Sequence, residues 1–214
     1  MVFEGVITFI SIVILGIIGM LRMTKGIMPL RANEAQQLPS LPGPSGLIYR
    51  LDGPEKKQRK LLEGKYPRIT PDGQIILPST WDSHVTAGRV AYAAYTWALC
   101  ILNEKDPEAA KNRHLAVARA TMIPFFTLLI LGIGMLFGLK FGIAFPIFLA
   151  VWAFFTFAAI PSQFRDWKAI ELAKSGLKES GLWPSSSTDA KAIERCLQAL
   201  AWCHVAGFRR IFPR

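Results

Sequence analysis

The side chains that could catalyse a reaction or bind a metal are few and lie far apart in the sequence. The chain has three cysteines and three histidines among 214 residues, and no two histidines have the HxxxH spacing that brings two imidazoles to one metal ion. Cys196 and Cys203 are seven residues apart in a helical pattern, so we interpret them as small buried thiols on one face. A metal site that also uses His204 is the alternative. His84 and His114 fit surface or capping positions, and neither a glycine-rich phosphate loop nor a G-x-S-x-G motif is present.

Three apolar stretches indicate membrane-spanning helices. Hydrophobic residues make up 51% of the chain and its mean hydropathy is +0.31, which is high for a soluble domain. The stretches cover residues 2–21, 122–139 and 142–160, and each is close to the length of about 20 residues that crosses the hydrocarbon layer. Only Lys140 and Phe141 separate the last two stretches, so we expect an antiparallel hairpin.

The basic residues determine the expected orientation. Arg22 and Lys25 follow the first stretch, and Arg165 and Lys168 follow the hairpin, so the positive-inside tendency places the N-terminus outside and most extramembrane mass in the cytoplasm. Basic residues after the first stretch also favour an uncleaved anchor over a signal peptide. We interpret the net charge of +10 as a face toward anionic lipid. We expect no nucleic-acid partner, because the basic run at 56–60 lacks interleaved aromatic residues.

The remaining segments predict short elements outside the membrane. Residues 38–46 are too rich in proline and glycine for a helix, and residues 54–65 suggest a short basic helix. A Pro-Asp-Gly turn between β-branched runs predicts a β-hairpin over 68–78. Asp82 or Ser83 can cap the helix that follows. A serine cluster opens an amphipathic C-terminal helix, which we expect either along the membrane surface or on the cytoplasmic part.

Together these elements predict a mainly α-helical integral membrane protein with about three transmembrane helices, a small β-hairpin and a cytoplasmic helical part. We expect five parts in this order: an N-terminal anchor (1–22), an extended Pro/Gly-rich and basic arm (23–66), a cytoplasmic β-hairpin with helices (67–121), a transmembrane helical hairpin (122–161) and cytoplasmic or interfacial C-terminal helices (162–214).

The order of these elements resembles one family of membrane enzymes. The stretch from Val90 to Ile101, VAYAAYTWALCI, precedes the membrane hairpin, and the run from Ile160 to Arg165, IPSQFR, ends it. Over about residues 66–208 this is similar to the bacterial membrane-bound neutral zinc metallopeptidases of the YugP type. In that family the zinc helix reads V-A-x-A-A-H-E-V-G-H-A-I and the later motif reads L-P-V-E-F-D. The resemblance implies a zincin-like helix beside a membrane hairpin, in the bacterial inner (cytoplasmic) membrane.

The residues that would bind and use zinc are replaced in this chain. Tyr95 and Leu99 stand where the resemblance implies zinc-binding histidines. Thr96 stands where it implies the glutamate that deprotonates the bound water. Gln163 replaces the implied third ligand, and Arg165 replaces the acid after it. Because none of these side chains is a good zinc ligand or base, we expect neither bound zinc nor peptidase activity.

We therefore expect a non-catalytic scaffold, a pseudo-metallopeptidase that stabilises a larger membrane complex such as a photosynthetic or respiratory assembly. Its expected partners are other integral membrane subunits and anionic lipid headgroups, with bound lipids but no other cofactor. The alternative is a peptidase-like protein that binds peptides in a groove near Tyr95 and Gln163, or that has a displaced hydrolytic site at Cys100, His84 or His114. The candidate residues for lipid or partner contact are Lys56, Lys57, Arg59, Lys60, Arg209, Arg210 and Arg214.

Overall fold

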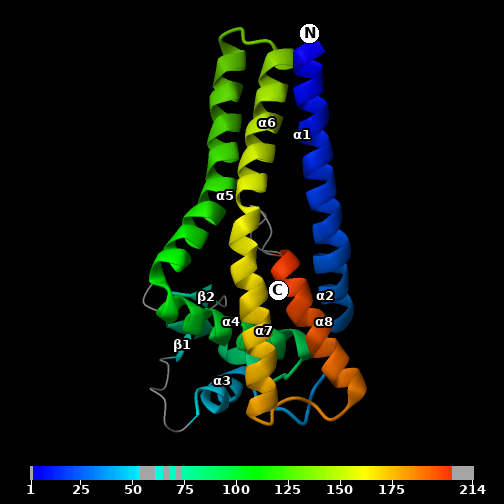
Figure 1. The fold of residues 1–214 in the computed structure, drawn as a ribbon, viewed down its shortest axis with the longest axis vertical. Coiled ribbons are helices and arrows are strands. Elements are labelled where there is room, and N and C mark those ends of the chain that lie inside the picture. Colours follow the sequence, from blue (N-terminus) through cyan, green and yellow to red (C-terminus); the bar gives the residue numbers. More distant parts are fainter. Residues whose placement is uncertain (1, 54–60, 65–67, 71–73, 204–214) are drawn as a thin grey trace.

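The computed structural model describes residues 2–53, 61–64, 68–70 and 74–203. Three long helical segments run to one end of the molecule, where the N-terminus and the α5–α6 turn lie, and the shorter elements form a core at the other end (Figure 1). The described elements are α1 (Val2–Leu21), the π-helix η1 (Arg22–Ile27), α2 (Met28–Asn33), α3 (Pro44–Asp52), β1 (Leu61–Glu63), β2 (Arg68–Ile69), β3 (Ile75–Leu77), the 3-10 helix η2 (Ser79–Trp81), α4 (Ala87–Lys105), α5 (Pro107–Leu136), α6 (Phe141–Ala158), the 3-10 helix η3 (Ile160–Ser162), α7 (Gln163–Glu179) and α8 (Ser187–Cys203).

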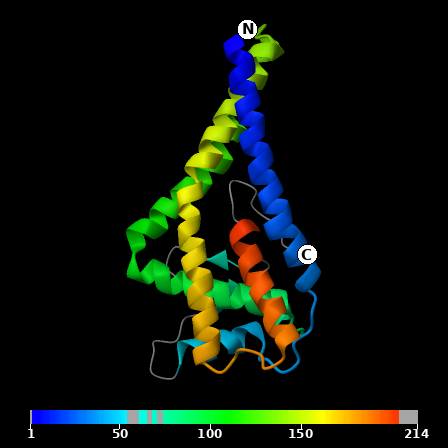
Figure 2. The same cartoon turned by 45° about the vertical axis from the view of Figure 1, so that its right-hand side comes forward.

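Three helical segments of the described chain are long and apolar enough to cross a membrane: Gly5–Asn33, Pro107–Leu136 and Phe141–Glu179. The expectation of a mainly helical chain with three such helices is confirmed. Each segment is longer than its apolar stretch, because polar turns continue the helix into the core. α6 packs against both α5 and α1, so it is the central helix of the three. The three segments lie close together at the tip and spread apart toward the core (Figure 2).

Helix α4 is the centre of the core. Every residue from Val90 to Cys100 is buried, and α3, α7 and α8 pack around this stretch. The indole Nε1 of Trp97 donates a hydrogen bond to Asp52 Oδ1 of α3 at 2.9 Å. Gly176 of α7 lies so close to Trp97 that an added Cβ would come within 2.7 Å of the indole ring. The apolar stretch is therefore a buried helix that holds three neighbours in place.

The segment between α1 and the sheet does not form the extended arm expected over 23–66. Its described residues include α2 and α3, and Leu38, Leu47 and Ile48 are fully buried in the core. Burying one such aliphatic side chain contributes about 1.5–3 kcal/mol, which favours the packed arrangement over a free arm. The proline and glycine residues of this segment suggested an extended arm, but its apolar side chains pack it onto the core.

Two helix starts also differ from the expectation. The carboxylate of Asp82 accepts a hydrogen bond from the Ser45 N–H at 2.9 Å, so it caps α3 rather than α4. Helix α4 is capped by Thr86, whose hydroxyl accepts from the Arg89 N–H. Pro44 stands in the first turn of α3, where a missing N–H costs nothing, so the proline-rich run does begin a helix.

The predicted β-hairpin is confirmed in its strands. β2 and β3 pair antiparallel, with Ile69 opposite Ile75; the turn residues 71–73 lie outside the described residues. β1 pairs parallel with the other edge of β3, which gives the order β1–β3–β2. Leu61–Glu63 is thus a strand where we expected the end of a basic helix, because pairing with the buried strand β3 satisfies its backbone. Residues 54–60 of that expected helix lie outside the described residues.

Helix α8 packs on the core, which is one of the two locations expected for it. It contacts α4, α2, η1 and α7, and it buries Ile193, Leu197 and Leu200. In its first turn, Asp189 Oδ1 accepts a hydrogen bond from Gln36 Nε2 at 2.6 Å. This contact ties the C-terminal helix to the segment after α2.

Candidate functional site

Tyr95 lies where α4, α5 and α7 meet. Its Oη donates to Asp166 Oδ1 of α7 at 2.5 Å. The guanidinium of Arg113, from α5, donates to the same oxygen at 2.6 Å and to the Tyr95 Oη at 3.3 Å. In this Tyr95–Asp166–Arg113 network, Tyr95 and Asp166 are each only 2% exposed, whereas the Arg113 side chain is 21% exposed and forms the solvent-facing edge. A single carboxylate oxygen therefore joins three helices.

The two tyrosines of α4 at this junction are neutral at physiological pH. Burial, together with the Asp166 carboxylate, raises the pKa of Tyr95 well above its usual value. Burial also raises the pKa of Tyr92, one turn earlier, to about 12. Tyr95 is therefore a hydrogen-bond donor to Asp166, and the metal-binding phenolate form is disfavoured.

The other positions singled out from the sequence lie at the same junction. The hydroxyl of Thr96 donates to the Tyr92 carbonyl oxygen at 2.8 Å, so it is engaged within its own helix. Leu99 is 4% exposed and belongs to the core. Gln163 is on α7, one turn before Asp166, and is 8% exposed; its Nε2 has no hydrogen-bond partner among the described residues. The fold thus brings the two sequence motifs together, because α4 and α7 pack directly on each other.

These side chains do not fit a zinc ion. Leucine has no donor atom, and a neutral amide, a hydroxyl and a neutral phenol are poor substitutes for imidazole and carboxylate. The nearby Arg113 guanidinium would repel a cation. Within the described ranges, no group of three or more His, Cys, Asp or Glu side chains is placed to hold a metal ion. Tyr95, Gln163 and Asp166 are all buried, so the open groove that peptide binding requires is not found at these described positions.

Arg165 has a role that its place in the motif did not suggest. Its guanidinium donates to the carbonyl oxygens of Leu102 and Asp106, at 2.5 and 2.9 Å. Leu102 is in the last turn of α4, and Asp106 is the residue that joins α4 to α5. Arg165 therefore fastens the start of α7 to the junction between α4 and α5.

The residues of the displaced-site alternative do not assemble. Cys100 is fully buried in α4, whereas His84 and His114 are exposed on a loop and on α5. A buried thiol and two surface imidazoles do not make a nucleophile with its base.

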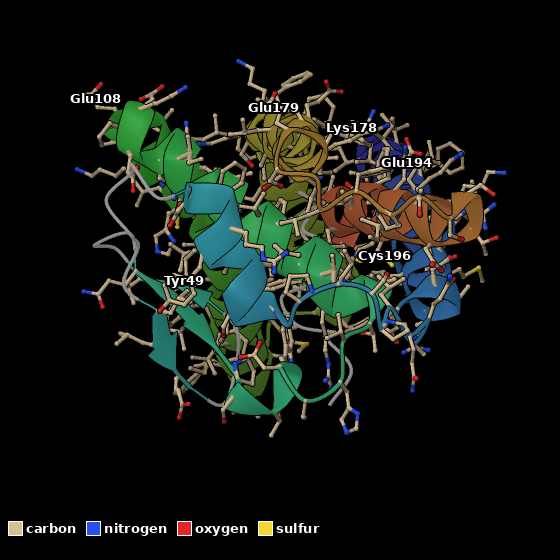
Figure 3. All side chains as sticks on the ribbon, turned by 90° about the horizontal axis from the view of Figure 1, so that it is seen from below. Tyr49, Glu108, Lys178, Glu179, Glu194 and Cys196 are labelled. Carbon is tan, nitrogen blue, oxygen red and sulfur yellow. The ribbon has the colours of Figure 1, made fainter. Side chains whose placement is uncertain are left out.

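Both C-terminal cysteines lie within the described residues, whereas the basic residues predicted to contact lipid or a partner do not. Cys196 is buried within α8 (Figure 3), and Cys203 is half-buried at its end. The third member of the alternative metal site, His204, lies outside the described residues. The candidate contact residues Lys56, Lys57, Arg59, Lys60, Arg209, Arg210 and Arg214 lie outside the described residues as well.

Sequence reasoning missed Asp166 and Arg113. Asp166 shares a buried face of α7 with Gln163, Ile170 and Ala173. An acid at helical spacing among apolar residues predicts a buried charge that needs a partner, so this signal was available. Arg113 is one of several basic residues in a polar stretch of α5, and its spacing alone did not distinguish it.

Comparison of the chain with protein-family models, with curated proteins and with solved structures finds no match.

Proposed function

We propose that this chain is a non-catalytic membrane scaffold with the architecture of a pseudo-metallopeptidase. Its three apolar helices span a bacterial inner membrane and its core lies on the cytoplasmic side. It acts as an accessory or stabilising subunit of a larger membrane complex, such as a photosynthetic or respiratory assembly. The observation that carries this proposal is the Tyr95–Asp166–Arg113 network, which places packing and an ion pair where the resemblance implies catalysis.

The energetics of the network support a structural role. Desolvation offsets much of the attraction in a buried ion pair, but removing one partner costs about 3–5 kcal/mol, because a charge is left buried alone. The network therefore disfavours any arrangement of α4, α5 and α7 that separates Asp166 from Arg113. A scaffold benefits from one fixed arrangement of its helices.

The charges at the core end support the proposed orientation. Lys25, Arg119 and Lys168 are exposed, one on each of the three apolar segments, near the place where its apolar part ends. At the other end, the α5–α6 turn has only the basic residue Lys140. Such an asymmetry favours the core on the cytoplasmic side.

The outer faces of the long helices support partners that are themselves integral membrane proteins. Phe154 and Phe157 on α6 are 65% and 62% exposed. Apolar side chains that stay exposed on a membrane-spanning helix face lipid tails or the helices of neighbouring proteins, and helices inside a membrane associate by van der Waals packing. We assign this face of α6 to neighbouring subunits.

A back-substitution tests the proposed origin of the site. Positions 95 and 99 are one turn apart on α4, and position 163 is on the turn of α7 that contacts α4. The triple variant Tyr95→His, Leu99→His and Gln163→Glu supplies two imidazoles and a carboxylate there. We expect no zinc in the purified wild type and about one zinc per chain in the triple variant, measured by atomic emission. The single variant Tyr95→His is the control and should bind little zinc.

The outcomes separate the parts of the proposal. Stoichiometric zinc in the wild type, or hydrolysis of a peptide substrate by it, would contradict the non-catalytic function. A folded triple variant that binds no zinc would contradict the relation to zinc peptidases. Orientation is tested by labelling Lys140→Cys and Lys111→Cys with a membrane-impermeant maleimide in intact cells, where only the first should react.

A further inference from the structure

A groove runs between α5 and α6 within their apolar parts. Pro124 interrupts α5 here: it has no N–H to donate to the Ala120 carbonyl, and a helix bends where this bond is missing. The upper part of α5, next to the turn into α6, lies beside α6, and its lower part turns away toward the core (Figures 1 and 2). The groove has a volume of about 190 Å³ and is lined by Ala120, Thr121, Pro124, Phe125 and Leu128 of α5 and by Phe148 and Trp152 of α6.

The size and chemistry of the groove fit an alkyl chain. Its residues on α5 run from Ala120 to Leu128, which is about 12 Å along a helix, so the groove is long and narrow, as an extended alkyl chain is. A helix with its side chains is about 10–12 Å across and does not fit. The lining side chains are aliphatic and aromatic; their polar groups are the indole N–H of Trp152 and the hydroxyl of Thr121, which already donates to the Val117 carbonyl oxygen at 2.8 Å.

The charge at the core end of the groove is positive. Arg119 directly precedes Ala120, is exposed, and is the last charged residue before the apolar part of α5. It forms no ion pair with an acidic side chain of the described residues. A phosphate-bearing headgroup complements this charge.

We propose that this groove holds one acyl chain of an anionic phospholipid, with the phosphate beside Arg119. The inference rests on the proposed insertion of α5 and α6 in a membrane. It assigns a lipid site to described residues, distinct from the basic residues at 56–60 and 209–214.

Native mass spectrometry of the full chain in mild detergent tests this site. Phosphatidylglycerol or phosphatidylcholine with the same acyl chains is added, and the bound fraction is compared. Thr121→Trp fills the groove, and Ile130→Trp is the matched control, because Ile130 is on the same helix, is 66% exposed and does not line the groove. Arg119→Glu reverses the charge, and Lys111→Glu is its control on the same helix.

We expect the wild type to retain one phosphatidylglycerol. Thr121→Trp should lower retention of both lipids by about tenfold, whereas Ile130→Trp should not. Arg119→Glu should remove only the preference for phosphatidylglycerol. Thr121→Ala, which leaves the groove open, should bind as the wild type does and so controls for disturbed folding. Equal retention by the two tryptophan variants would overturn the site, and equal retention by Arg119→Glu and the wild type would overturn the headgroup assignment. Release of the chain from membranes by carbonate would instead contradict membrane insertion itself.

Discussion

Removing the Tyr95 hydroxyl should destabilise the protein by an amount that the geometry determines. Tyr95→Phe keeps the ring and deletes the hydrogen bond from Oη to Asp166 Oδ1, together with the longer one that Oη accepts from Arg113 at 3.3 Å. Tyr95 and Asp166 are both 2% exposed, so water cannot easily replace the lost donor. A hydrogen bond to a charged group contributes about 1.5–3 kcal/mol. For a chain of this length, a loss of about 2 kcal/mol lowers the Tm by about 4 to 8 °C.

Thermal unfolding of the detergent-solubilised chain, followed by circular dichroism, measures this loss. Tyr49→Phe is the matched control: it makes the same chemical change on α3 at the surface of the core, where Tyr49 is 45% exposed (Figure 3), and it should leave the Tm unchanged. Arg113→Ala should cost more, about 3–5 kcal/mol, because it leaves the buried Asp166 carboxylate without its cation. If Tyr95→Phe and Tyr49→Phe unfolded at the same temperature, the network would not hold α4 to α7 and the reasoning would be refuted.

Three further outcomes are expected. The pKa of Tyr92 is raised to about 12 in the folded chain, so the stability that the neutral Tyr92 phenol contributes is complete below pH 10 and is lost as the pH rises. The free energy of unfolding should therefore fall between about pH 10 and 12. In Tyr92→Phe this fall should be smaller by up to about 1.4 kcal/mol per pH unit, measured by chemical denaturation. Gly176→Ala should lower the stability of the protein by about 1–3 kcal/mol, because the added Cβ overpacks against Trp97. Gly16→Ala is the control and should not destabilise the protein, since no atom lies within 4 Å of its added Cβ. Equal melting temperatures of the two variants would contradict the close packing. Burial raises the pKa of the Cys196 thiol to about 12, so maleimide should label it at neutral pH only after denaturation, and rapid labelling of the native chain would contradict its burial.

The long helices could be predicted from sequence because their signal is local. Each apolar stretch is continuous, and two residues between the last two leave room only for a turn. The pairing of β2 with β3 was predicted for the same reason, since turn residues and β-branched runs are neighbours in sequence. The helix ends were predicted less well, because polar turns continue each helix beyond its apolar stretch.

The arrangement of the core could not be predicted in the same way. Gln36 and Asp189, which bond to each other, are 153 residues apart in the sequence. The proline-rich segment packs on α4 because Leu38 and Leu47 are buried by residues distant in sequence. At the candidate site, the resemblance pointed to Tyr95 on α4 and Gln163 on α7, two helices that pack on each other, but the residue of α7 that bonds to Tyr95 is Asp166. Arg113, the cation that completes the network, comes from a third helix and follows only from the tertiary structure.

The most direct test of the scaffold proposal is extraction of the protein from native membranes in mild detergent. The extract is separated by size, its proteins are identified by mass spectrometry, and zinc is assayed on the same fraction. We expect the chain to migrate in a fixed ratio with a larger membrane complex and to carry no zinc. A small free particle with stoichiometric zinc would contradict the proposal and would show that the metal is held by residues other than Tyr95, Leu99 and Gln163.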